Sequence, residues 1–121
     1  MLRIMAILFG IGFIFAGVAG FLPSFTTDNL LLGYFEVDGM HNIAHITSGV
    51  LAIMAATSLK YTRWYFQLFG IIYALLGIVG FWRGGDLYFM TVNFADNILH
   101  SVIGVLALYL GFFFKSKETG L

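Results

Sequence analysis

The sequence predicts an all-α integral membrane protein built from four transmembrane helices. Of the 121 residues, 60% are hydrophobic and only 10% are charged, and the apolar residues fall into four long stretches. Soluble proteins carry about 25% charged residues, so this composition is typical of a chain that faces lipid. A helix needs roughly 17 to 25 mainly apolar residues to cross a bilayer. The predicted spans are Ile4–Leu22, Met40–Leu59, Tyr65–Trp82 and Phe94–Phe114.

The first span is expected to be a retained membrane helix. Its start, with Arg3 ahead of an apolar run, is similar to a secretory signal. The run is nevertheless as long as a full span, and its segment Leu8–Ile11 recurs as Leu68–Ile71 in the third span, where no signal could lie. Pro23, the one proline in the chain, marks the end of this span because proline cannot continue a helix.

The second and fourth spans contain one phrase twice. Asn42–His45 followed by Gly49–Ala52 recurs 55 residues later as Asn97–His100 followed by Gly104–Ala107. The first and third spans match at an offset of 60, with stripes of glycine that favour close helix contacts in lipid. We therefore predict one membrane domain, residues 1–121, made of two tandem parallel hairpins, with repeat 1 at about 4–59 and repeat 2 at about 65–114. Their relation is a pseudo-twofold axis along the membrane normal.

The charges predict the topology. Short positively charged segments stay in the cytoplasm. The basic residues gathered on one side are Arg3, Lys60, Arg63, Lys115 and Lys117. The opposite side carries Asp28, Glu36, Asp38, Asp86 and Asp96 against a single Arg83. Both termini are thus expected in the cytoplasm. The net charge of zero and the lack of a basic patch argue against nucleic acid as a partner, and the lack of cysteine excludes thiol chemistry.

The repeated polar residues Asn42, His45, Asn97 and His100 form the candidate binding site. Within each copy the asparagine and histidine share one helix face with a glycine and an alanine, so we expect all of them to face the bundle interior. One interpretation is structural: the asparagine and histidine side chains hydrogen-bond to each other across the axis. On this interpretation the site is a packing feature.

Two further interpretations make the histidines ligands. His41 and Asp96 lie one turn before His45 and His100, so these four side chains could hold one divalent ion such as zinc. Alternatively, His45 and His100 are the axial ligands of a haem, with Gly49 and Gly104 making room for the macrocycle. A transport role is less favoured because no charge lies at mid-depth in any predicted span.

The duplicated N-x-x-H-x-x-x-G phrase, the Leu-Phe-Gly-Ile segments and the four predicted spans resemble a bacterial family of four-span membrane proteins, domain of unknown function 4383. The most specific matches are Asn42 with His45, and Asp96 and Asn97 with His100. The resemblance implies a protein of the bacterial cytoplasmic membrane and adds no activity. We therefore expect a binding or accessory protein, not an enzyme. Its expected partners are the lipid bilayer and other membrane subunits or a second copy of itself, and a divalent metal or haem is the alternative cofactor.

Overall fold

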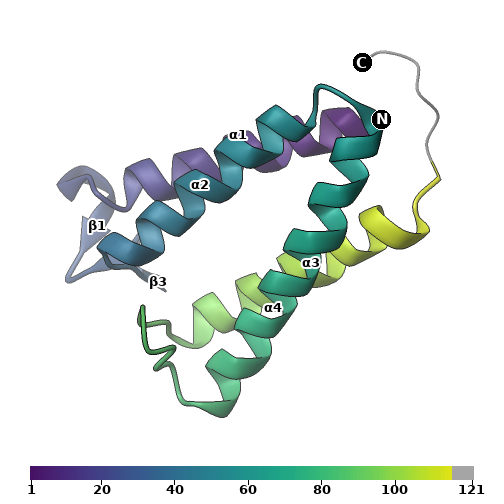
Figure 1. Ribbon diagram of the computed structural model, residues 1–121. Helices are drawn as coiled ribbons and strands as arrows, with labels where there is room; N and C mark the ends of the chain where they lie inside the picture. Colours follow the sequence, from purple (N-terminus) through teal and green to yellow (C-terminus); the bar gives the residue numbers. More distant parts are fainter. Residues whose placement is uncertain (116–121) are drawn as a thin grey trace.

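The computed structural model describes residues 1–115 and confirms the all-α class. Its α-helices are α1 (Leu2–Ala19), α2 (Gly39–Ala55), α3 (Leu59–Trp82) and α4 (Phe94–Leu108), and a π-helical turn, η2 (Tyr109–Phe113), continues α4. Lys117, which the sequence analysis grouped with the other basic residues, lies outside the described residues. The helices are arranged as two pairs, α1 with α2 and α3 with α4 (Figure 1).

Three helical segments are long and apolar enough to cross a membrane: Leu2–Ala19, Leu59–Trp82 and Phe94–Phe113. These helices indicate a membrane protein. The remaining helix, α2, has 17 residues and is about 25 Å long, at the lower limit for a span. It packs along the length of α1, as a second span of a hairpin would.

Some helices begin or end at other residues than the predicted spans, because hydrogen bonds at the helix ends set these limits. α3 begins at Leu59, six residues before the predicted Tyr65, because the Ser58 side chain caps it by accepting from the backbone N–H of Tyr61 at 3.1 Å. Hydropathy places the start later because the first turns of α3 carry charge. α2 ends at Ala55 instead of Leu59, since the tight turn into α3 uses the residues between them.

The first connecting loop contains structure that the sequence analysis did not predict. A short 3-10 helix, η1 (Pro23–Phe25), precedes three antiparallel strands of two residues each: β1 (Thr26–Thr27), β2 (Leu30–Leu31) and β3 (Phe35–Glu36). Asp28 and Asn29 join β1 to β2 with positive φ angles of 52° and 64°, as a two-residue primed turn requires. Strands this short leave no periodic pattern in the sequence.

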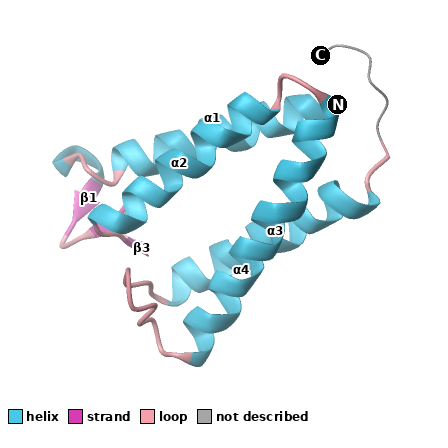
Figure 2. Cartoon of the chain, in the orientation of Figure 1, coloured by secondary structure: helices cyan, strands magenta, loops and turns pink. Residues whose placement is uncertain are grey.

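The loops and the chain termini lie at opposite ends of the helices. The small sheet and the α3–α4 loop lie at one end (Figure 2), where Asp38 accepts from the backbone N–H of Thr91 at 3.0 Å and joins the two loops. The N-terminus, the α2–α3 turn and the end of η2 lie at the other end (Figure 1). The predicted acidic and basic groups are thus separated along the helices, as far as Lys115.

Glycine sets the distance between the helices of each pair. A Cβ atom on Gly49 of α2 would lie 2.6 Å from the carbonyl oxygen of Gly10 in α1, and a Cβ atom on Gly70 of α3 would lie 2.8 Å from the backbone nitrogen of Leu108 in α4. Such backbone contacts exclude any side chain. The predicted packing function of these glycines agrees with this geometry.

Candidate functional site

Three histidines from two helices meet inside the protein, close to the end that carries the small sheet. His41 and His45 come from the first two turns of α2, and His100 comes from the second turn of α4. The ring centroids lie 4.5 Å apart for His41 and His45, 5.4 Å for His41 and His100, and 5.9 Å for His45 and His100. One nitrogen of each ring lies within 4.8 Å of a nitrogen of the other two. We call these three residues the histidine cluster.

The helix starts place the cluster. Asp38 begins α2 by accepting a hydrogen bond from the backbone N–H of His41 at 2.8 Å, so His41 and His45, four residues apart, share one face of the helix. Asn93 begins α4 through a reciprocal capping box with Asp96. This start sets the rotation of α4 that directs His100 toward α2. The two caps, which lie where the loops meet the helices, therefore fix the positions of the three histidine side chains.

The cluster is buried and unpaired. His41 and His100 have no exposed surface and His45 is 5% exposed. Within residues 1–115, none of the six ring nitrogens has a hydrogen-bond partner. An unpaired buried polar group costs roughly 1–3 kcal/mol, so three such rings in contact are an arrangement that folding alone does not favour.

The hydrogen bonds that the structural interpretation predicted are absent among the described residues. The side-chain oxygens of Asn42 and Asn97 also lack partners. Each oxygen instead packs against a glycine of the neighbouring helix, Asn42 against Gly20 and Asn97 against Gly80, where a Cβ atom would collide with it. The expected network across the axis was thus wrong, although all four predicted residues face the interior as expected, with at most 5% exposure.

Asp96 lies near the cluster but is engaged elsewhere. Its side chain is 1% exposed, and its Oδ2 accepts from the backbone N–H of Asn93 at 3.0 Å. The Asn93 side chain accepts from the backbone N–H of Asp96 at 2.9 Å in return. Among the described residues, the group of potential metal ligands that meet consists of the three histidines, without this carboxylate.

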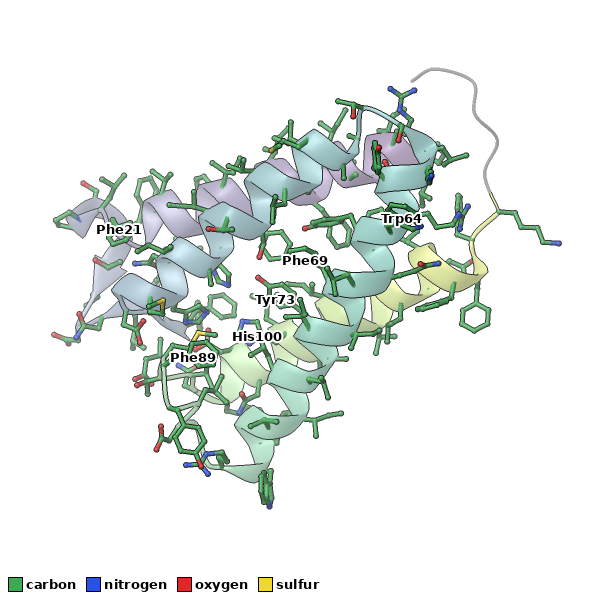
Figure 3. The ribbon with its side chains drawn as sticks, viewed as in Figure 1. Phe21, Trp64, Phe69, Tyr73, Phe89 and His100 are labelled. Atoms are coloured by element: carbon green, nitrogen blue, oxygen red, sulfur yellow. The ribbon has the colours of Figure 1, made fainter. Side chains whose placement is uncertain are left out.

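Aromatic and hydroxyl groups continue the site toward the basic end. The Tyr73 ring of α3 lies 5.5 Å from the His100 ring, and the two residues are labelled side by side in Figure 3. The Tyr73 hydroxyl is 2.8 Å from the Ser48 hydroxyl, and the Tyr65 hydroxyl donates to the Ser48 carbonyl at 2.8 Å. Sequence reasoning missed both tyrosines. Tyr73 lies three residues after Gly70 and four before Gly77, so its place on the glycine stripe was the available signal.

An open groove of about 270 Å³ adjoins the cluster between α1 and α4. Seven residues line it: Phe9, Gly12, Phe13, Ala16, His45, Leu99 and Ile103. Its walls are almost wholly apolar, and His45 is the one lining residue with a hydrogen-bonding side chain. The groove between the two helix pairs thus reaches the cluster at His45.

Comparison with known proteins gives a family. Residues 3–113 match the family model described as domain of unknown function (DUF4383). The chain belongs to this family. Searches among curated proteins and among solved structures found no match.

Proposed function

We propose that this DUF4383 protein binds one divalent first-row metal ion, with zinc as the best fit, through His41, His45 and His100. The observation that carries the proposal is the set of six buried ring nitrogens without partners, one from each ring lying within 4.8 Å of the others. A metal ion turns this unfavourable arrangement into a bound one, because each neutral imidazole offers one lone pair.

The ligand chemistry favours zinc. Imidazole suits zinc and other late first-row ions, and three histidines with an open fourth position are a known zinc ligand set. Ligands at 2.0–2.1 Å in a tetrahedral site lie about 3.4 Å apart, so small side-chain rotations bring nitrogens within 4.8 Å of each other into range. The remaining nitrogen of each ring then carries a proton. For His41, the backbone groups of Glu36 and Thr91 lie near the ring without forming a hydrogen bond to it, and they would accept this proton once the ring has turned.

A bare ion fits the site better than a haem. The space that Gly49 and Gly104 were expected to give to a macrocycle is filled by neighbouring helices: the backbone of Gly10 and Ile14 faces Gly49, and that of Ala74 faces Gly104. The His41 ring also packs against both proposed axial ligands. A porphyrin between His45 and His100 would need all these groups to move.

Zinc binding is tested with purified protein in lipid nanodiscs, by competition with a chelator of known affinity. We expect one zinc per chain, and each of the variants His41→Gln, His45→Gln and His100→Gln to weaken binding at least tenfold. Tyr73→Phe is the matched control, because it keeps the ring against His100 and removes no ligand. Zinc affinity that is unchanged in all three histidine variants would refute the proposal.

Asp96→Asn separates two versions of the site. The amide preserves an acceptor for the capping box but is a poor metal ligand. A three-histidine site predicts less than a tenfold loss of zinc affinity, whereas loss as large as in the histidine variants would make the carboxylate the fourth ligand.

We also propose that the protein lies in the cytoplasmic membrane of a bacterium with both termini inside, as an accessory protein to other membrane subunits or to a second copy. The separation of basic and acidic residues between the two ends supports this orientation. Because the chain has no cysteine, Asp28→Cys and Asp86→Cys provide single labels. Both should react with an impermeant thiol reagent added outside, and Lys60→Cys should not; the opposite pattern would reverse the topology.

A further inference from the structure

The groove between α1 and α4 has the properties of a ligand site entered from the lipid. α1 and α4 belong to different helix pairs and pack on each other far less than the helices within a pair. Gly12 is exposed and lies near the middle of α1, so in a membrane the groove opens at the apolar depth of the bilayer. A molecule that reaches it must therefore be dissolved in the membrane.

Gly12 keeps the groove open without serving helix packing. A Cβ atom on Gly12 would meet no atom within 4 Å, unlike one on Gly10 or Gly17 of the same helix. Sixty residues later, at the positions of α3 that match Gly12 and Ala16 in sequence, the chain carries Ile72 and Leu76. Glycine lowers helix stability and here gains no close contact in return. The small side chains that leave the groove open in α1 are thus not repeated in α3.

The groove contains one polar side chain, His45, and its other lining residues offer this side chain no hydrogen-bond partner. His45 lines the groove and is 5% exposed, but both of its ring nitrogens are buried without partners among the described residues, so the ring has to turn to present an N–H to the groove. A neutral imidazole has one N–H, and binding a metal through the other nitrogen leaves that donor in place. The other lining side chains are hydrocarbon or glycine, so an acceptor has to come with the ligand.

We propose that the groove binds the head of a membrane-dissolved quinone, with a ring carbonyl accepting a hydrogen bond from His45. A flat ring suits the aromatic side chains of Phe9 and Phe13 and the bare backbone at Gly12. The volume of about 270 Å³ is slightly below the ~300–1,000 Å³ of pockets that enclose whole ligands, so it takes the ring and leaves the tail in lipid. The proposal concerns binding and requires no metal.

The test measures binding of a radiolabelled benzoquinone with a decyl tail to the full chain in nanodiscs, corrected for empty nanodiscs. We expect saturable binding of one molecule per chain. Two probes separate the sources of affinity: decylbenzene has the ring without oxygens, and methyl decanoate has a carbonyl without the ring. Both should bind at least tenfold more weakly. Equal affinity for decylbenzene would mean apolar filling only, equal affinity for the ester would remove the ring from the argument, and no saturable binding would overturn the proposal.

A groove-filling variant distinguishes this site from the metal site. Gly12→Ile with Ala16→Leu introduces the residue types that α3 carries and meets open space at residue 12. We expect at least a tenfold loss of quinone affinity with zinc binding unchanged, while Val18→Ile on the exposed face of α1 changes neither. Quinone affinity that survives the double substitution would overturn the proposal. Quinone binding by protein that never binds zinc would support the groove and refute only the metal site.

Discussion

Replacing Asp38 by alanine should destabilise the protein at the start of α2, next to the histidine cluster. The carboxylate makes two separate bonds: Oδ1 accepts from the backbone N–H of His41 at 2.8 Å, and Oδ2 accepts from that of Thr91 at 3.0 Å. The first bond caps α2, and the second joins the first connecting loop to the α3–α4 loop. One side chain therefore fixes the start of α2 at His41 and joins the two loops to each other.

The loss of free energy of unfolding in Asp38→Ala can be calculated from these two hydrogen bonds. Loss of an N-cap side chain costs about 1 kcal/mol, and loss of the exposed bond from the Thr91 backbone N–H to the carboxylate costs about 1.5 kcal/mol. Asp38→Ala should lower the free energy of unfolding by about 2–3 kcal/mol. Asp38→Asn retains one acceptor oxygen, so it can keep only one of the two bonds and should cost about 1–1.5 kcal/mol.

The assay is reversible unfolding by sodium dodecyl sulfate in mixed micelles. Asp28→Asn is the matched control: it removes the same charge from the same loop, Asp28 forms no hydrogen bond or ion pair within residues 1–115, and asparagine suits its positive φ of 52°. It should change the free energy of unfolding by less than about 0.5 kcal/mol. The reasoning is refuted if Asp38→Ala behaves like this control, or if Asp38→Asn costs as much as Asp38→Ala.

Three other substitutions have defined outcomes in the same unfolding assay. Gly104→Ala should cost about 1–3 kcal/mol, because its Cβ would collide with the backbone of Ala74; a neutral effect would show that the helices separate easily. Gly12→Ala should stabilise the protein by up to about 1 kcal/mol, since it meets open space in a helix, and a loss of stability would contradict the groove. Tyr73→Phe should cost about 0.5–1.5 kcal/mol, because Ser48 keeps its bond to the Ala44 carbonyl; a cost above 3 kcal/mol would point to a larger network.

Patterns that depend on helix geometry could be predicted from the sequence. Asn42, His45, Asn97 and His100 all lie inside because positions three and seven residues apart share a face whatever the neighbouring helix is. The packing glycines followed from the same rule. The family was predicted from the duplicated phrase, the Leu-Phe-Gly-Ile segments and the four predicted spans, and its model matches residues 3–113.

Features that depend on the distance between helices could not be predicted. The expected hydrogen bonds of Asn42 and Asn97 failed because the opposing glycines bring a bare helix backbone against each side-chain oxygen. Of the two residues predicted one turn earlier, His41 enters the cluster, whereas Asp96 is held in the capping box with Asn93. The groove could not be predicted because, in the sequence, Gly12 cannot be told from the glycines that pack between helices. Only the arrangement of α1 and α4 shows that nothing packs against it.

X-ray absorption at the zinc edge, on protein loaded with one equivalent of zinc in lipid, tests the central claim most directly. The account predicts three imidazole nitrogens at about 2.0–2.1 Å and one further light-atom ligand. The imidazole scattering should decrease by a third when any one of His41, His45 and His100 is replaced by glutamine. A spectrum with oxygen ligands and no imidazole, or one that the histidine substitutions leave unchanged, would contradict a metal site built from the histidine cluster.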